Sequence, residues 1–159
     1  MDKAKTTAEA DLGRINEIVA EYSQQKWALI PLLQEVQEEF GYIPPEAIRL
    51  IARGLGLFPA QVQGVISFYA QFYTARQGRN IVKVCRGTAC YTRGGVRILS
   101  EMEKQLGIKP GETTCDFKYT LEAIACFGSC ALAPVVVIGK NVYGRMTPTK
   151  VGQILADTK

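Results

Sequence analysis

Two cysteine pairs constrain this chain most, because each pair stands directly after a β-type run of residues. Cys85 and Cys90 lie in CRGTAC, and Cys126 and Cys130 lie in CFGSC, with a glycine inside each pair. Consecutive strands are usually neighbours in one sheet. If these two strands are neighbours that point the same way, their loops leave the sheet at one edge. The four sulfur atoms are then expected to meet there.

The spacing of the pairs favours an iron–sulfur cluster over other uses of cysteine. Structural zinc sites commonly use C-x2-C pairs, whereas the spacings here are C-x4-C and C-x3-C. A 2Fe-2S cluster takes four thiolates, and wider pairs suit a centre with two metal ions. A zinc site is the second alternative. A disulfide or redox-active thiol pair is the third, and it lacks the C-x-x-C motif of thiol–disulfide enzymes.

Other residues narrow the chemistry further. The chain has no histidine, which excludes Ser-His-Asp and Cys-His catalysis and every His-ligated metal. Five cysteines make an odd number, which does not suit a framework built only from disulfides. Cys115, in TTCDFK, has no partner at ligand spacing and is given no role.

Basic residues flank the first cysteine pair and would offset the negative charge of a cluster. Each of them alone is most simply a solvated side chain; they are Lys83, Arg86, Arg93 and Arg97. The net charge of the chain is only +4, and its basic residues form no run. We therefore expect no nucleic-acid partner.

Length and composition are those of a soluble globular protein. The chain has 159 residues, of which 47% are hydrophobic and 21% charged; this length suits one domain, or one domain with a helical appendage. The N-terminus lacks the apolar core of a signal peptide. The longest apolar run lies near VVVI, far short of the roughly 18 residues of a membrane span. We expect a cytoplasmic protein without membrane insertion, whose thiols stay reduced.

The first half of the chain predicts an all-helical unit after a frayed tail over residues 1–10. Apolar residues recur at helical spacing in four segments that begin near Asp11, Ala28, Pro45 and Pro59. The third segment is expected to end at Gly54 and Gly56. The apolar positions expected to face inward are Leu12, Ile15, Val19, Tyr22, Leu29, Leu32, Leu33, Val36, Phe40, Ile48, Leu50, Ile51, Val62, Val65, Ile66 and Tyr69.

The second half predicts a small α/β domain. NIVKVC alternates like a strand, a second strand is expected near 119–125, and PVVVIGKNVYGR reads as two strands around a turn. GVRILSEMEKQLG reads as a helix whose inner face carries Val96, Leu99, Met102 and Leu106. A last helix begins after Thr147 as N-cap. This order of elements predicts helices that cover a sheet. The chain is therefore expected to have a helical domain over residues 1–76 and an α/β domain over residues 77–159.

The stretches CRGTACYTRGG, TTCDFKYTLEAIACFGSCALAPVV and LIPLLQEVQEEFGYIP resemble the thioredoxin-like 2Fe-2S ferredoxins. They resemble most the small 2Fe-2S subunit of NADH dehydrogenases, found in respiratory complex I and in soluble NAD(P)-linked hydrogenases and formate dehydrogenases. The likeness runs from about residue 12 to the C-terminus. It implies an N-terminal helical bundle followed by a thioredoxin-like α/β domain. It also implies one 2Fe-2S cluster with Cys85, Cys90, Cys126 and Cys130 as ligands.

The resemblance further implies a non-catalytic electron carrier within a larger oxidoreductase. Its partners would be a larger flavoprotein subunit that holds FMN and binds NAD(H), together with further iron–sulfur subunits. GLGLFP does not follow a strand, so it fails the context of a nucleotide-binding turn, and FMN and NAD(H) are assigned to the partner. By the same resemblance, Arg86 favours the soluble, electron-bifurcating hydrogenase or formate dehydrogenase type over the complex I type. The alternative is a zinc-stapled structural or interaction module.

Overall fold

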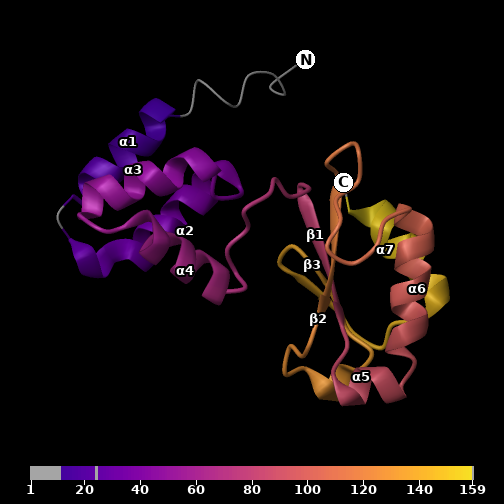
Figure 1. Cartoon of the computed structure of the whole chain (residues 1–159). Helices are drawn as coiled ribbons and strands as arrows, with labels where there is room; N and C mark the ends of the chain where they lie inside the picture. Colours follow the sequence, from indigo (N-terminus) through magenta and orange to yellow (C-terminus); the bar gives the residue numbers. More distant parts are fainter. Residues whose placement is uncertain (1–11, 24, 159) are drawn as a thin grey trace. The chain divides into compact units, whose positions relative to one another are not determined.

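The computed structural model describes residues 12–23 and 25–158. The chain divides into two compact units, Met1–Arg76 and Gln77–Lys159, drawn in indigo to magenta and in magenta to yellow (Figure 1). The tail predicted over residues 1–10 lies outside the described residues. Within those ranges no helix is both long and apolar enough to cross a membrane. That the two units are independently folding domains stays a prediction.

The elements that the structure describes in the first unit are all helices, as the sequence predicts. Its elements are α1 (Leu12–Glu21), the 3-10 helix η1 (Lys26–Ala28), α2 (Leu29–Phe40), α3 (Pro45–Leu55) and α4 (Pro59–Phe68). Prolines stand in the first turns of α2, α3 and α4, where a missing N–H breaks no helical hydrogen bond. Gly41 ends α2 at φ 78°, and its N–H bonds the carbonyl of Gln37 at 2.7 Å. Left-handed glycine is a common way to end a helix.

The helical core follows the apolar periodicity, with three corrections. Leu32, Leu33 and Val36 are fully buried, as expected. Gly54 does not end α3 but lies inside it, because the helix passes close over Val19 of α1 and only glycine leaves room there. The inner face of α3 is therefore Ala47, Ile51, Ala52 and Leu55, with Ile48 and Leu50 half-buried. Leu12 and Tyr69 are exposed rather than inward-facing, because they stand at the beginning of α1 and just past the end of α4.

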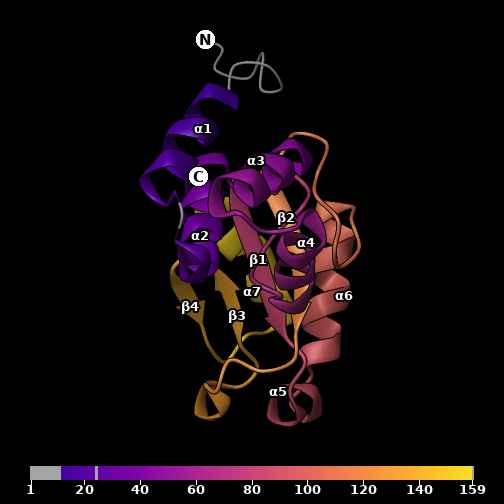
Figure 2. The same ribbon diagram turned by 60° about the vertical axis from the view of Figure 1, so that its left-hand side comes forward.

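The second unit is built on a four-stranded mixed sheet. Its strands are β1 (Asn80–Cys85), β2 (Tyr119–Ile124), β3 (Val136–Ile138) and β4 (Asn141–Tyr143), in the order β2-β1-β3-β4 (Figure 2). β1 and β2 are parallel, with Cys85 opposite Ile124. β3 runs antiparallel to β1 and pairs with β4 through a short turn. The two parallel strands consequently end at the same edge of the sheet.

Two helices, α6 (Gly95–Leu106) and α7 (Pro148–Asp157), cover one face of the sheet (Figure 1). Ile98 and Met102 of α6 and Val151 and Ile154 of α7 pack on the inward side chains of β1, β2 and β3. Val96 was expected on this inner face, but it is 47% exposed. The face begins one residue earlier, at Gly95, because α6 starts against the loop that follows β1.

Two local features differ from the sequence prediction. A short helix α5 (Thr88–Thr92) follows β1 and was not predicted, because five residues are too few to show helical periodicity. Thr147 precedes α7 as expected, yet its side chain caps no backbone N–H. Its hydroxyl lies 2.9 Å from the hydroxyl of Thr149 instead.

Candidate metal centre

The first cysteine pair is held between a strand end and a short helix. Cys85 is the last residue of β1, and Cys90 lies within α5. The N–H of Cys85 donates to the carbonyl of Val135 at 3.1 Å, and the N–H of Arg86 donates to that of Ile124 at 2.8 Å. These bonds tie the start of the first loop to the elements that carry the second pair.

The second pair follows β2 at the same edge. Cys126 stands two residues after β2, and Cys130 begins the 3-10 helix η2 (Cys130–Leu132). Both α5 and η2 lie beyond one end of the sheet (Figures 1 and 2). The N–H of Arg145, in the segment between β4 and α7, donates to the carbonyl of Leu132 at 2.6 Å. That segment therefore braces the second cysteine loop.

The two loops touch through Gly87. A Cβ added at this glycine would lie 2.9 Å from the carbonyl oxygen of Ala125 and 3.4 Å from Sγ of Cys126. Gly95, the first residue of α6, is packed in the same way: an added Cβ would lie 2.8 Å from the carbonyl oxygen of Cys90. Glycine is needed at both places because backbone approaches backbone too closely for a side chain. Sequence reasoning noted Gly87 but missed Gly95, which has no local signal.

The four side chains lie close enough to interact. Cys85 interacts with Cys90 and with Cys126, and Cys130 interacts with Cys126. Backbone N–H groups of Gly87 and Phe127 also bond Cys85, that of Val135 bonds Cys90, and that of Gly128 lies 3.3 Å from Sγ of Cys126. The structure thus brings together all four cysteines of the two pairs.

This environment separates the pKa values of the thiols. Burial raises the pKa of Cys85, but the hydrogen bonds from Gly87, Cys90, Phe127 and Cys126 together outweigh burial and lower it. Burial and donation to Cys85 raise the pKa of Cys90. Donation to Cys126 and the charge of that group raise the pKa of Cys130. The thiolate, which is the form that binds metal, is therefore favoured at Cys85 and disfavoured at Cys90 and Cys130.

The site has a buried side and an exposed side. Cys85 and Cys90 are 4% and 2% exposed and pack with Ala133 and Val135, whereas Cys126 and Cys130 are exposed. The first pair is thus shielded from water by apolar neighbours. The second pair faces solvent.

Two residues considered from the sequence lie apart from this arrangement. Cys115 is exposed in the loop before β2, at the opposite end of that strand from Cys126. Lys83 lies in the middle of β1 and pairs with Glu122 of β2 at 3.7 Å, so a carboxylate already offsets its charge. Arg86, Arg93 and Arg97 remain exposed near the cysteine loops.

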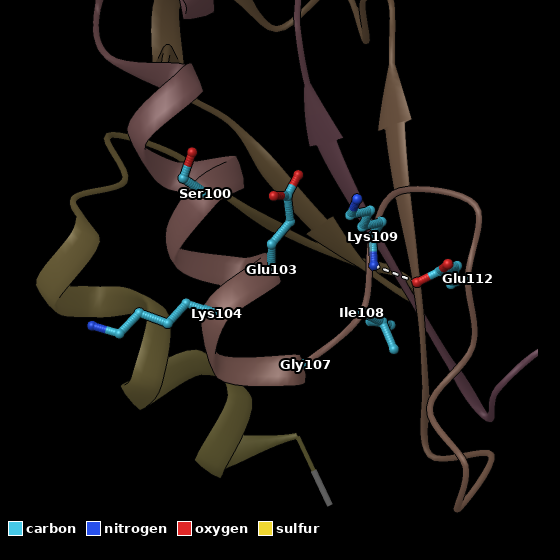
Figure 3. A pocket seen from close by; sticks show the side chains of 7 residues that line it. All are labelled: Ser100, Glu103, Lys104, Gly107, Ile108, Lys109 and Glu112. Carbon is cyan, nitrogen blue, oxygen red and sulfur yellow. Dashed lines mark hydrogen bonds between the residues drawn. The ribbon is translucent and has the colours of Figure 1, made fainter.

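A surface pocket in this unit holds no cysteine. Its wall on α6 is formed by Ser100, Glu103 and Lys104, and Gly107, Ile108, Lys109 and Glu112 follow from the next loop (Figure 3). The N–H of Lys109 donates to the Glu112 carboxylate at 2.7 Å. This loop follows the C-terminal end of α6, whereas the cysteine centre lies at its N-terminal end near Gly95. The pocket is therefore separate from the cysteine centre.

Comparison with known proteins decides the family. A model of the thioredoxin-like [2Fe-2S] ferredoxin family matches residues 15–159. The chain belongs to the thioredoxin-like [2Fe-2S] ferredoxin family. This ferredoxin-family chain is 38% identical over 134 residues to the NADP-reducing hydrogenase subunit HndA of Solidesulfovibrio fructosivorans, covering 84% of the chain and 78% of that relative. It is 34% identical over 148 residues to a subunit of the NADH-quinone oxidoreductase of Pseudomonas aeruginosa, covering 93% of the chain and 89% of that relative.

A solved structure supports the fold of this ferredoxin. A chain of an NAD+-reducing [NiFe]-hydrogenase aligns with a TM-score of 0.68 at 18% identity, over 82% of the present chain. The present chain spans only 22% of that hydrogenase chain, so the likeness concerns the fold alone.

The residues present fit the one 2Fe-2S cluster that the family carries. Such a cluster takes four thiolates, and the two loops at this edge of the sheet carry four cysteines that would supply them. Over residues 12–23 and 25–158, no three cysteine or carboxylate side chains are already arranged to hold a metal ion. The fit therefore rests on the number of thiols and on the shared edge of the sheet to which β1 and β2 bring them. The close packing of Gly87 against Ala125 and Cys126 keeps the two loops near enough for both to bind one cluster.

Proposed function

We propose that this chain is the electron-transfer subunit of a multisubunit NAD(P)H-dependent oxidoreductase and holds one 2Fe-2S cluster on Cys85, Cys90, Cys126 and Cys130. The observation that carries the proposal is the parallel pairing of β1 and β2, which brings the loops with both cysteine pairs to one edge of the sheet, where Gly87 packs against Cys126. When bound, a 2Fe-2S cluster accepts and releases single electrons. FMN and NAD(H) are expected on a partner flavoprotein subunit, which exchanges electrons with this chain, and further iron–sulfur subunits complete the assembly.

The residues around the thiols have separable tasks. The buried pair, Cys85 and Cys90, holds its side of the centre away from water, which limits hydrolysis and lowers the local dielectric. The backbone N–H groups of Gly87 and Phe127 at Cys85, and that of Val135 at Cys90, favour the thiolate form and so stabilise negative charge there. The exposed pair, Cys126 and Cys130, faces the surface and is the side on which electrons enter and leave.

Among parent complexes, we favour the soluble hydrogenase or formate dehydrogenase type, with electron bifurcation. The similarity to a subunit named for an NADP-reducing hydrogenase, 38% identical, supports this choice. Arg86 supports it by the resemblance noted above. Subunits of NADH-quinone oxidoreductase at 34% identity keep the complex I type as the other candidate. Isolating the native assembly and identifying its other subunits by mass spectrometry distinguishes the two.

Ligand substitution tests the cysteine assignment. Cys85→Ser, Cys90→Ser, Cys126→Ser and Cys130→Ser should each lose the cluster or alter its visible and EPR spectra, because a serine oxygen is a harder, poorer ligand for iron in a cluster. Iron and acid-labile sulfide are measured on protein purified without oxygen, and about two of each per chain are expected in the wild type. Cys115→Ser is the matched control and should keep both spectrum and iron content. A colourless protein with one zinc ion, or loss of the cluster in the Cys115 variant, would refute the assignment.

A further inference from the structure

The end of the second unit that carries the cysteines contains basic residues and no acidic ones. Residues 85–100 and 124–147, which include both cysteine loops, contain no Asp or Glu; within them only the β3–β4 turn around Lys140 lies at the opposite end of the sheet. The carboxylates of this unit lie farther along α6, in the loop before β2, within β2 and at the end of α7. Charge is thus distributed unevenly along the strand direction.

Four arginines are exposed at this end: Arg86, Arg93, Arg97 and Arg145. Arg86 follows Cys85, Arg93 and Arg97 flank the junction of α5 with α6, and Arg145 is hydrogen-bonded to the second cysteine loop through its backbone. In the part of the chain that the structure describes, ion pairs involve other residues, and none reaches these four guanidinium groups. Their charge is therefore available to a partner.

Arg145 occupies a conformation that non-glycine residues rarely adopt. Its φ is 49°, in the left-handed region, and its neighbour Gly144 is packed against Leu132 so closely that an added Cβ would lie 2.8 Å from Cβ of Leu132. A left-handed bulky residue stores roughly 1–3 kcal/mol of strain, and such strain concentrates at functional sites. Here it holds a cationic residue beside the second cysteine loop.

Apolar side chains are exposed among these arginines. Tyr91, Val96 and Leu132 are 58%, 47% and 43% exposed. Tyr91 directly follows Cys90, and Leu132 ends the 3-10 helix that begins at Cys130. Tyrosine and arginine are enriched in protein–protein interfaces, whose apolar centre is surrounded by polar groups. We call the four arginines and these three apolar residues the cluster-end surface.

We propose that the cluster-end surface docks an acidic patch of a redox-active protein, whose carboxylates surround its own cofactor. This inference rests on the proposed function and names the chemistry of the surface that the flavoprotein partner presents. Cys126 and Cys130 are exposed residues, so a partner that docks here comes close to the centre, and four cations with no carboxylate among them complement an acidic surface. Complementary charge accelerates encounter more than it tightens the final complex.

The test measures association with the flavoprotein subunit separated from the native assembly. Surface plasmon resonance gives the association rate constant between that subunit and the cluster-loaded chain at about 20 mM and about 200 mM NaCl, between which charge screening increases strongly. We expect Arg→Gln at all four arginines to lower the association rate at low salt by about tenfold or more. The wild-type rate should fall with salt, and the variant should lose most of that dependence.

Two matched variants control for net charge and for folding. Arg79→Gln, Lys109→Gln, Lys118→Gln and Lys140→Gln remove the same charge from exposed positions away from the cysteine loops and should change the rate by less than about twofold. Arg→Lys at the four positions keeps the charge and should restore fast, salt-dependent association. The visible spectrum and circular dichroism of each variant confirm that it is loaded and folded.

Each outcome decides between the hypotheses. Equal losses in the test and control variants, or no loss in the test variant, overturn the docking surface while leaving the proposed function intact. A wild-type chain that carries its cluster but fails to bind the flavoprotein at either salt concentration overturns the proposed partner and the docking surface together. Loss in the test variant alone, restored by lysine, supports the proposal.

Discussion

Substituting Gly87 by alanine tests whether the contact between the two cysteine loops holds the metal centre together. The added Cβ would lie 2.9 Å from the carbonyl oxygen of Ala125. An ordinary contact of this kind is about 3.5 Å, so one loop must move by roughly 0.5 Å. The obstacle is backbone, which cannot turn away as a flexible side chain would.

The energetic consequence can be worked from two opposing terms. Overpacking of this kind destabilises by about 1–3 kcal/mol. Gly87 has φ −58° and ψ 156°, which alanine adopts freely, so the lower entropy of the unfolded chain returns about 0.4–1 kcal/mol. The net loss is about 1–2 kcal/mol, which corresponds to a fall in Tm of roughly 5–15 °C for a unit of this size. The loop movement should also shift the visible spectrum of the cluster.

The assay follows circular dichroism and cluster absorbance together during heating without oxygen. Gly152→Ala is the matched control in the same unit, because a Cβ there meets only the end of the Gln105 side chain at an ordinary 3.4 Å. Removing a glycine from the interior of α7 should stabilise by about 0.5–1 kcal/mol. A Gly87→Ala protein whose Tm and spectrum equal those of the wild type would refute the reasoning about the loops.

Two further predictions concern the scaffold. Thr120→Val should destabilise the second unit by about 1–3 kcal/mol. The buried Thr120 hydroxyl accepts a 2.7 Å hydrogen bond from the N–H of Gly78 and lies 2.8 Å from the hydroxyl of Thr113. Urea unfolding measures the loss of stability, and an unchanged midpoint would contradict this prediction. Leu33→Ala should destabilise the helical unit by about 2–5 kcal/mol, because Leu33 is fully buried; loss of helical circular dichroism at lower urea measures it, and the visible spectrum of the cysteine centre should not change. A bleached centre in the Leu33 variant would show that the two units do not unfold separately.

Much of the fold follows from local signals. Apolar spacing and first-turn prolines place α2, α3 and α4, and alternation places β1, because helices and strands impose periods of 3.6 and 2 on the chain. Where the periodicity is short or interrupted, the sequence misleads. α5 is too short to show a helical repeat, and Gly54 does not end α3 because it packs against Val19 inside that helix. Such cases depend on a neighbour distant in sequence.

The amino-acid order by itself predicts which residues carry the chemistry: two cysteine pairs, each just after a strand, with no histidine to offer another ligand. Folding was needed to show that β1 and β2 run parallel side by side, that the first pair is buried while the second faces water, and that Lys83 is already paired. It also brought Arg145 to the second cysteine loop from a segment beyond β4. Spacing limits what a short stretch of chain can form, whereas burial, charge pairing and proximity arise between segments that meet only in the folded molecule.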